Sequence, residues 1–255
     1  MPELLARKTA LILGVANKWS LAYAIAQAFR REGAQLLLTY QGERQKETVT
    51  ELGSALGAAA IFECDVTREE DLTKLAETVR QHGRLDTLVH SIAFANREDL
   101  TRPFVETSRE GYLLAQDVSA YSLVSAARTV APMMTEGGSV ITLSYLGATR
   151  VVTNYNVMGV AKAALEACVR YLSSDLGPSN IRVNAISAGP VKTASARAVA
   201  GLSKMLETMP TRAPLRRNCT PEEVADTAVF LASDLGRGVT GNVLFVDAGY
   251  QVMGF

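Results

Sequence analysis

Tyr155 and Lys162 are the residues best placed to carry out chemistry in this chain. They stand seven positions apart in the stretch YNVMGVAKAAL, which reads as part of a helix. A helix turns about 100° and rises about 1.5 Å per residue, so Lys162 returns to within about 20° of Tyr155 and lies about 10 Å further along the axis. The spacing predicts a phenol and an ammonium group on one helix face, directed at the same cleft.

The length of this spacing indicates the kind of reaction. Compared with a spacing of four, it moves the phenol about 4.5 Å further along the helix from the ammonium group. When a ketone is reduced, the acid serves the oxygen of the carbonyl whose carbon receives hydride. When a conjugated double bond is reduced, hydride enters the β-carbon and negative charge develops on the more distant carbonyl oxygen. We interpret the long spacing as fitting the second geometry, although tyrosine and lysine also meet at helical spacing by chance.

Further residues are expected at the same edge. The run SVITLSYLGATR predicts a strand that ends near Tyr145, and loop packing is the alternative explanation for this side chain. The next run, IRVNAISAGPVKT, predicts a strand followed by a Gly189-Pro190 turn. Such a turn would bring backbone toward a nicotinamide amide and the hydroxyl of Thr193 toward a pyrophosphate.

Short apolar runs alternate with helix-periodic stretches along the whole chain. Strands are predicted for TALILGVA, QLLLTY, AAIFECDV, TLVHSIAFA, SVITLSY, IRVNAISAG and NVLFVDAG. Strand–helix alternation implies right-handed crossovers and a parallel sheet. We therefore predict an α/β fold, a single doubly wound Rossmann-type domain over residues 1–255, with a seven-stranded parallel sheet and helices on both faces.

Two helix starts and one lid are predicted from local patterns. The stretch from Thr67 to Glu70 has the pattern of a capping box, and the stretch from Thr220 to Glu223 has a cap, a proline at the first helical position and a glutamate at the third. Residues from about 193 to 214 are helix-prone but loosely patterned, and they follow a strand end. That placement predicts a substrate-binding lid.

The carboxyl ends of the first, third and fourth strands are the expected dinucleotide site. After the first strand comes GVANKWSLAYAIA, in which Gly14 is the one glycine of a poor fingerprint and Ser20 is placed to cap a helix whose N-terminus could hold a pyrophosphate. Asp65 could accept from the adenine amino group while Val66 packs near the ring. Ala93 would let backbone approach a ribose. Ordinary turn, cap and core roles are the alternatives for these positions.

The second strand ends in TYQGERQ and indicates which dinucleotide is used. It lacks the Asp or Glu that often takes the ribose hydroxyls in NAD sites. Gln41 could bond those hydroxyls neutrally, whereas Arg44 could meet a 2′-phosphate, although an arginine in such a loop is more often simply solvated. We expect NADH, with NADPH as the less favoured cofactor.

Composition narrows the class of protein. The 255 residues, 48% of them hydrophobic, suit one globular domain. Equal totals of 26 basic and 26 acidic residues offer no general attraction for nucleic acid or an anionic membrane. Cys64, Cys168 and Cys219 are far apart, so neither a disulfide framework nor a metal site is expected. The start, MPELLARKTA, lacks a signal-peptide run, which predicts a reducing, cytoplasmic location.

Together these residues resemble the enoyl-[acyl-carrier-protein] reductase family of bacterial fatty-acid synthesis, a divergent branch of the short-chain dehydrogenases. The resemblance runs through GVANKWS, PMMTEGGSVITLSYLGA, NYNVMGVAKAALEA, IRVNAISAGPVKT and APLRRNCTPEEVADTAVFLASD, and covers essentially the whole chain. The long tyrosine–lysine spacing and the glycine-poor first turn are features of that family. Ala93 and Val191 replace residues that are often Gly and Ile, which affects packing and not the type of reaction.

The resemblance implies a role for each matching position. Tyr155 would hydrogen-bond the enolate oxygen, Tyr145 would help to position substrate, and Lys162 would bond the cofactor ribose and support the phenol electrostatically. Ala95 lies where family members meet the acyl substrate. The other implied dinucleotide contacts are Gly14, Ser20, Leu21, Gln41, Asp65, Val66 and Ile92, together with Val191, Lys192, Thr193, Ala194 and Ser195 beside the nicotinamide and ribose.

The implied reaction reduces a trans-2-enoyl thioester carried by acyl carrier protein. Hydride passes to the β-carbon, and the enolate is then protonated at the α-carbon. A homotetramer is implied as well. Because the carrier is acidic, its expected contacts are basic residues near the lid, unless these are merely solvated charges, namely Lys204, Arg212, Arg216 and Arg217.

Two other functions compete with this interpretation. A 3-oxoacyl or other alcohol reductase of the same fold would need a serine where Thr142 stands and a lysine where Gly159 stands. A dinucleotide-sensing regulatory protein without catalysis should have lost Tyr155 or Lys162, and both remain. An enoyl thioester and a 3-oxoacyl thioester, assayed in parallel, separate the two enzymes.

Overall fold

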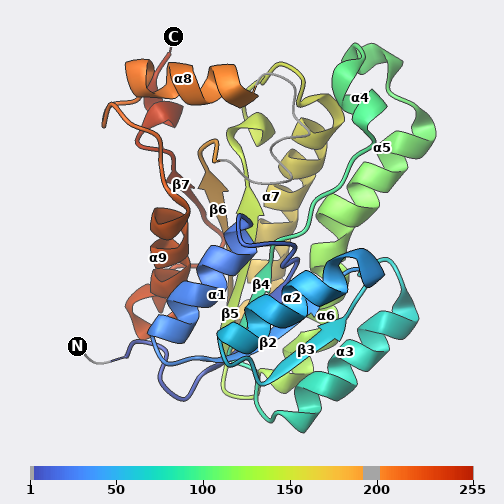
Figure 1. Cartoon of the computed structure of the whole chain (residues 1–255), viewed down its shortest axis with the longest axis vertical. Helices are drawn as coiled ribbons and strands as arrows, with labels where there is room; N and C mark the ends of the chain where they lie inside the picture. Colours follow the sequence, from blue (N-terminus) through green and yellow to red (C-terminus); the bar gives the residue numbers. More distant parts are fainter. Residues whose placement is uncertain (1–2, 192–201, 255) are drawn as a thin grey trace.

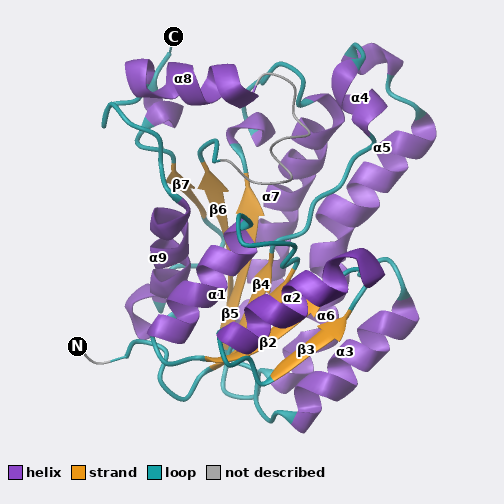
Figure 2. Ribbon diagram, in the orientation of Figure 1, coloured by secondary structure: helices purple, strands orange, loops and turns teal. Residues whose placement is uncertain are grey.

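Parallel strands form one sheet at the centre of the molecule (Figure 2). The structure is a computed structural model that describes residues 3–191 and 202–254. Within these residues the sheet has seven strands, in the order β3-β2-β1-β4-β5-β6-β7, and each neighbouring pair is parallel. The predicted seven-stranded Rossmann-type sheet is confirmed. Its strands are β1 (Thr9–Leu13), β2 (Gln35–Tyr40), β3 (Ala60–Glu63), β4 (Thr87–His90), β5 (Gly138–Ser144), β6 (Ile181–Ala188) and β7 (Val243–Val246).

Two helical layers cover the sheet, one on each face (Figure 1). One layer contains α1 (Leu21–Arg31), α2 (Glu43–Ala55) and α9 (Pro221–Ala232), and the other contains α3 (Glu69–Gln81), α6 (Ser122–Val130) and α7 (Asn156–Leu176). All five residues of β1 are buried. A strand covered on both faces must be apolar throughout, which explains why its sequence is a continuous apolar run without alternation.

Three further helices lie toward the carboxyl ends of the strands (Figure 1). They are α4 (Arg97–Thr101), α5 (Arg109–Gln116) and α8 (Leu202–Arg212). The last of these occupies most of the described part of the predicted lid, residues 193–214. Elements at this end of an open α/β sheet surround the place where ligands bind.

The helix start predicted at Thr220 is confirmed. The Thr220 hydroxyl accepts from the Glu223 N–H at 3.3 Å, and the Glu223 carboxylate accepts from the Thr220 N–H at 2.9 Å. Pro221 follows at the first helical position, where its missing N–H leaves no partner unsatisfied. This reciprocal capping box fixes the start of α9.

The capping box predicted at Thr67 is wrong. Helix α3 begins at Glu69 with Arg68 as its N-cap, and no side chain caps it. The Thr67 hydroxyl instead donates to a carboxylate oxygen of Asp65 at 2.7 Å. A nearby ionised acceptor outcompetes the helix end for this hydroxyl, because hydrogen bonds to charged groups are the stronger ones.

A π-helical turn, Asp117–Tyr121, joins α5 to α6. Its fully buried Ser119 exchanges two hydrogen bonds with the backbone of Phe94: the hydroxyl accepts from the Phe94 N–H at 2.9 Å and donates to its carbonyl at 3.0 Å. Turns of this kind occur frequently at functional sites. Here the turn holds the segment that follows β4, next to Ala95.

Two kinds of feature are not found in the described structure. Across residues 3–191 and 202–254, no helix combines the length and the apolar character needed to cross a bilayer. In the same ranges, His, Cys, Asp and Glu side chains form no group of three or more that could hold a metal ion.

Candidate active site

The end of β5 carries the first of the candidate catalytic groups. Ser144 is the last residue of β5, and Tyr145 follows it at the start of a 3-10 turn, Leu146–Ala148. The Tyr145 ring meets the Tyr155 ring edge-on, with centroids 4.9 Å apart and planes at 68°. The structure therefore brings together the two tyrosines that the sequence predicted for this edge.

Tyr155 stands at the N-terminus of α7, where the backbone is unusual. Tyr155 is the N-cap residue, with φ −101° and ψ −30°, and α7 begins at Asn156. Asn154 and Asn156 have positive φ angles of 63° and 39°, a region that asparagine tolerates better than most non-glycine residues. The Asn156 amide also donates to the carbonyls of Leu100 and Arg102, at 3.0 and 2.7 Å. Tyr155 therefore precedes α7 and does not lie within it as the sequence predicted, and this anchored turn, not helical rotation alone, sets the position of the phenol.

Two glycines permit close packing around Tyr155. A Cβ on Gly147 would lie 2.4 Å from Cδ1 of Tyr155, and a Cβ on Gly159 would lie 2.8 Å from the Gly147 carbonyl oxygen. Position 159 is the one four residues after Tyr155, where the competing 3-oxoacyl reductase would need its lysine. A side chain there would collide with the backbone of the 3-10 turn, so the geometry opposes that function.

Lys162 is buried in α7 with 6% of its surface exposed. Its Nζ donates to the Leu143 carbonyl at 2.7 Å. Burial lowers the pKa of Lys162 to about 8, and the carboxylate of Glu166 acts in the opposite direction. An ammonium group has three donors, and the described residues engage one of them through this hydrogen bond.

Both phenols are protonated at neutral pH, as an ordinary tyrosine is, and burial makes their ionisation harder still. It raises the pKa of Tyr145 to about 12, with a further contribution from Tyr250. It also raises the pKa of Tyr155, with Tyr145 as the second cause. A neutral phenol donates a hydrogen bond, so either group can stabilise negative charge that develops on a substrate oxygen.

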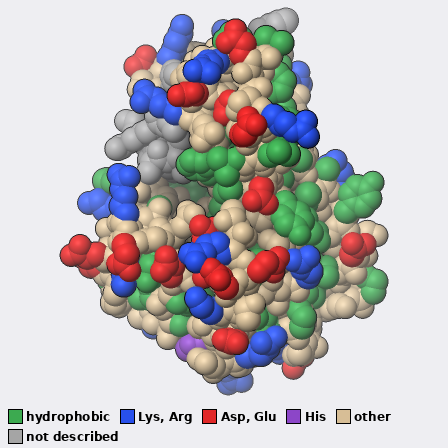
Figure 3. All heavy atoms as spheres, turned by 90° about the vertical axis from the view of Figure 1, so that its right-hand side faces the viewer, with side chains coloured by type: hydrophobic (Ala, Val, Ile, Leu, Met, Phe, Trp, Pro, Cys, Tyr) green, Lys and Arg blue, Asp and Glu red, His purple; other side chains and the backbone are tan. Residues whose placement is uncertain are grey.

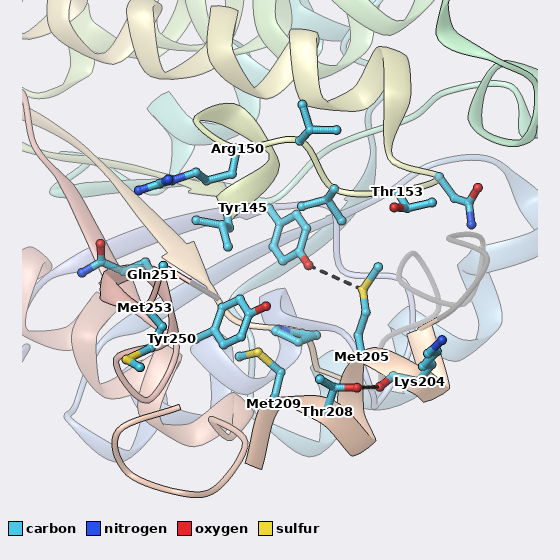
Figure 4. Close-up of a pocket in the computed structure, with 16 residues that line it drawn as sticks. Tyr145, Arg150, Thr153, Lys204, Met205, Thr208, Met209, Tyr250, Gln251 and Met253 are labelled. Atoms are coloured by element: carbon cyan, nitrogen blue, oxygen red, sulfur yellow. Dashed lines mark hydrogen bonds between the residues drawn. The ribbon is translucent and has the colours of Figure 1, made fainter. Parts of the chain in front are cut away.

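A cavity of about 690 Å³ opens beside Tyr145. Figure 4 shows the Tyr145 hydroxyl pointing at Met205 of α8, with an oxygen–sulfur distance of 3.7 Å. Met209 of α8, together with Tyr250 and Met253 after β7, forms other walls. Walls of this kind, apolar with a few polar groups, suit a long apolar ligand.

Sequence reasoning missed the part of the chain that follows β7. Tyr250, Gln251 and Met253 line the cavity together with α8. A signal was available, because β7 is parallel to the other strands and its carboxyl end must open at the same edge of the sheet. Met205 and Met209 fall inside the predicted lid but were given no role.

Ala95, the predicted substrate contact, lies among the candidate catalytic residues. It packs with Tyr145 against a small buried cluster that contains Tyr155 and Met158. Tyr155 itself is 9% exposed. The three predicted substrate residues are therefore brought together in one place.

The candidate cofactor site begins at the carboxyl ends of β1 and β4, where the strand order reverses. Gly14 follows β1 with φ +90°, and a Cβ there would lie 2.2 Å from the Ser91 carbonyl oxygen. Ser20 caps α1, because its hydroxyl accepts from the Tyr23 N–H at 3.2 Å. The first turn of α1, which begins at Leu21, carries no acidic side chain, so its N–H groups and helix dipole present an unopposed positive end. These residues fit a bound pyrophosphate.

Gln41 and Asp65 meet beside the ends of β2 and β3. The Gln41 amide donates to Asp65 at 2.9 Å, and the N–H and hydroxyl of Thr67 donate to the other carboxylate oxygen at 3.0 and 2.7 Å. Burial acts to raise the pKa of Asp65, but these hydrogen bonds outweigh it and lower the pKa. Val66 and Ile92 belong to the adjoining apolar cluster. An ionised acceptor beside apolar side chains fits an adenosine.

The remaining predicted cofactor contacts are placed only in part. Val191 is described and is 7% exposed. Arg44 is exposed in the first turn of α2. The other predicted contacts beside the nicotinamide lie outside the described residues, namely Lys192, Thr193, Ala194 and Ser195.

Known proteins share this sequence and architecture over nearly the whole chain. Residues 14–251 match the family model described as Enoyl-(Acyl carrier protein) reductase. The chain is 54% identical to the enoyl-[acyl-carrier-protein] reductase (NADH) of Bacillus cereus, over 99% of this chain and 100% of that one. It is 48% identical to the NADPH form of Staphylococcus aureus, over 98% of each chain.

A solved structure shows the same agreement in three dimensions. The crystal structure of the Bacillus cereus reductase with NADP⁺ and an indole naphthyridinone matches with a TM-score of 0.97, at 54% identity, over 99% of this chain and 100% of that one. This chain therefore resembles named reductases. It has the long tyrosine–lysine spacing, a crowded position 159 and a cavity beside α8. The chain belongs to the enoyl-[acyl-carrier-protein] reductase family of the short-chain dehydrogenases.

Proposed function

We propose that the protein is an enoyl-[acyl-carrier-protein] reductase that uses NADH to reduce the trans-2 double bond of enoyl thioesters in fatty-acid elongation. Relatives of that name match nearly the whole chain at 54% and 48% identity. The structural observation that carries the proposal is the contact between Tyr145 and Tyr155 beside an apolar cavity, with Lys162 buried in the helix that begins after Tyr155. When bound, NADH supplies the hydride that the β-carbon of the substrate receives.

The side chains of this protein manage the charge that the substrate then carries. The neutral phenol of Tyr155 donates a hydrogen bond to the enolate oxygen, where negative charge collects. Tyr145 borders the cavity and orients the thioester end of the substrate. Lys162 bonds the ribose hydroxyls of the cofactor and favours the developing negative charge through its positive field. Protonation of the enolate at its α-carbon completes the saturated thioester.

The residues that hold the cofactor divide into three groups by position. Gly14, Ser20 and Leu21 receive the pyrophosphate at the N-terminus of α1. The second group, beside the ends of β2, β3 and β4, would hold the adenosine and consists of Gln41, Asp65, Val66 and Ile92. The third group would border the nicotinamide and its ribose and consists of Lys162, Val191, Lys192, Thr193, Ala194 and Ser195.

NADH is the preferred dinucleotide in this proposal. Gln41 can bond the ribose hydroxyls without a charge, and the ionised carboxylate of Asp65 that it contacts repels a 2′-phosphate. Arg44 is the residue that would favour NADPH. Relatives of both kinds exist, since the Bacillus cereus reductase is named for NADH and that of Staphylococcus aureus for NADPH. A comparison of kcat/KM for the two cofactors decides the preference.

The activity is tested by mixing the protein with NADH and a crotonyl or longer trans-2-enoyl thioester and following the loss of nicotinamide absorbance. We expect rapid oxidation of NADH with the enoyl substrate and little with a 3-oxoacyl thioester of the same length. Consumption of the 3-oxoacyl substrate alone would contradict the proposal and support the alcohol-reductase alternative.

We also propose that residues 193–214 form a lid and that acyl carrier protein docks beside it. Lys204 of α8 lines the cavity, and both Lys204 and Arg212 are exposed. Two other basic residues have internal partners. Arg216 donates to the Thr211 carbonyl, and Arg217 pairs with the capping carboxylate of α9 at 2.5 Å. Lys204 and Arg212 are therefore the stronger candidates for the acidic carrier.

Charge reversal tests the docking surface. Arg212→Glu should lower kcat/KM for carrier-linked substrate while leaving turnover of the same acyl group on coenzyme A largely unchanged, because only the carrier presents an extended acidic surface. Lys204→Glu changes the cavity wall, so it should lower kcat/KM for both substrates, and more for the carrier-linked one. Arg80→Glu on α3, far from α8 in Figure 1, is the matched control. Equal turnover of carrier-linked substrate by all three variants would contradict the docking proposal.

A homotetramer in the cytoplasm completes the proposal. The side of the molecule that carries α4 and α5 shows hydrophobic side chains at its surface (Figure 3), and large exposed apolar patches commonly mark interfaces. Sedimentation of the purified protein tests the assembly, and a monomer would contradict it. Large exposed apolar residues on α5 and the segments next to it are Phe104, Val105, Tyr112, Leu113 and Tyr121.

A further inference from the structure

Two buried charges lie one helical turn apart on α7. Lys162 and Glu166 are each 6% exposed. Adjacent residues at the end of β5 hold both of them: the Lys162 Nζ donates to the Leu143 carbonyl at 2.7 Å, and the Ser144 hydroxyl donates to a carboxylate oxygen of Glu166 at 2.5 Å. One strand end therefore binds both a buried ammonium group and a buried carboxylate of α7.

This arrangement leaves most of the ammonium group available. Glu166 accepts from Ser144, and Lys162 spends one donor on a backbone carbonyl. Two donors of Lys162 therefore remain for a ligand. A direct hydrogen bond from Lys162 to the carboxylate would use one of them. The carboxylate can still act on the ammonium through space, because charges in a poorly solvated interior interact strongly.

Burial makes that electrostatic support necessary. An isolated buried lysine tends to lose its proton. Burial lowers the pKa of Lys162 to about 8, and Glu166 is the group that opposes the shift. Burial raises the pKa of Glu166, while Ser144, Arg170 and Lys162 lower it. Each charge thus helps to keep the other ionised.

No other described neighbour of Lys162 takes over this role. His90 of β4 is fully buried, and its ring nitrogens contact the hydroxyls of Thr142 at 3.0 Å and Ser122 at 2.8 Å. Burial first, and the charge of Lys162 second, lower the pKa of His90 to about 3, so it stays neutral where the enzyme works. Arg170 is exposed and of the same sign as Lys162.

We propose that Glu166 is a positioning residue, which keeps the Lys162 ammonium charged and its free donors available to the cofactor ribose. Nothing in the sequence pattern alone assigned a role to this glutamate. The inference rests on the proposed function, because Lys162 matters here as a cofactor contact. Glu166 acts through Lys162 and touches neither substrate nor cofactor.

Glu166→Gln is the informative substitution, because the amide keeps the shape and can still accept from Ser144 but carries no charge. The dissociation constant of NADH is measured by fluorescence, without substrate, from roughly pH 6 to 9, which brackets the ionisation of Lys162. We expect near-normal affinity at the acidic end. The loss of affinity at the basic end should begin about one pH unit lower than in the wild-type protein.

Three controls accompany this test. Glu166→Asp retains the charge, so its loss of affinity at high pH (the basic limb of the profile) should match that of the wild-type protein. In a Lys162→Arg background, Glu166→Gln should produce no shift, because a guanidinium group does not titrate in this range. If the glutamine variant does not fold, Glu166→Asn serves instead, with Glu166→Asp as its charged counterpart: it also removes the charge and should shift the limb in the same direction.

The outcomes separate the possibilities. Weaker binding by the same factor at every pH, or an unchanged profile, would show that Glu166 has at most a structural role and would overturn the proposal. Because binding is measured without substrate, it also stands apart from the proposed function. A protein that binds NADH with the expected basic limb but ignores enoyl thioesters would contradict the function and leave the role of Glu166 in place.

Discussion

Tyr155 and Tyr145 present two phenols whose rings touch, yet they should contribute differently to catalysis. Tyr155→Phe removes the donor to the enolate oxygen and should lower kcat by about a hundredfold or more, with the NADH dissociation constant nearly unchanged. Tyr145→Phe should have a smaller effect, expressed mainly in KM for the thioester. Steady-state kinetics and fluorescence titration measure both. Unchanged turnover of the Tyr155 variant would refute its role.

Gly14 is a residue whose missing side chain has a measurable consequence. Gly14→Ala combines a positive φ with a Cβ that would lie 2.2 Å from the Ser91 carbonyl oxygen, and it should lower the free energy of unfolding by about 2 kcal/mol or more. Gly83→Ala is the matched control, since its φ of +89° is nearly the same but nothing lies within 4 Å of the new Cβ; it should cost only about 1 kcal/mol. Urea unfolding measures both, and equal losses would contradict the argument.

Residue spacing predicted much of the site but not the support beneath it. Tyr155 and Lys162 could be paired from sequence because their separation fits a helix and their chemistry is distinctive. The contact between Ser144 and Glu166 could not be predicted, because it joins a strand end to a helix and depends on the depth at which α7 packs. Thr67 shows a different error: its hydroxyl bonds the Asp65 carboxylate two residues earlier, so a pattern that resembles a capping box caps no helix.

Among the secondary-structure elements, α9 has the best-defined start. Thr220→Ala removes the hydroxyl of its capping box and should lower the free energy of unfolding by about 1 kcal/mol. Thr73→Ala is a suitable control, because Thr73 lies within α3, where its exposed hydroxyl donates to the carbonyl four residues earlier, and alanine favours the helix there. A smaller loss for Thr220→Ala than for Thr73→Ala would contradict the capping argument.

The strands were easier to predict than the segments that connect them. A strand covered on both faces favours a continuous apolar run, as in residues 10–13 of β1 and 36–38 of β2. Short connections such as α4 and the π-helical turn lack a comparable pattern, because their geometry depends on contacts with other elements. The pair of hydrogen bonds between Ser119 and Phe94 is one example, since it links positions 25 residues apart.

The stability of the whole molecule should depend on pH through His90. Its pKa is lowered to about 3 by burial in the fold, compared with 6.5 for an ordinary histidine. The unfolded chain therefore binds more protons below about pH 6.5, and the stability present above that pH is lost as the pH falls toward 3. The slope should be on the order of 1 kcal/mol per pH unit.

Urea unfolding at roughly pH 7 and pH 5 measures this loss. His90→Gln should reduce the dependence on pH, because an amide can satisfy the neighbouring hydroxyls without taking up a proton. His82→Gln leaves His90 in place, so the acid sensitivity should persist in that variant. Identical slopes for His90→Gln and the wild-type protein would contradict the assignment.

The wall that Tyr250, Gln251 and Met253 contribute to the cavity bears on how the protein should be handled. In Figure 1 the described chain ends beside α8, whereas it begins lower on the left side, away from α8. An affinity tag appended to the C-terminus would follow Gly254, which lines this cavity, whereas a tag at the N-terminus would precede a segment whose described residues do not line it. Purification handles for kinetic work on this enzyme therefore belong at the N-terminus.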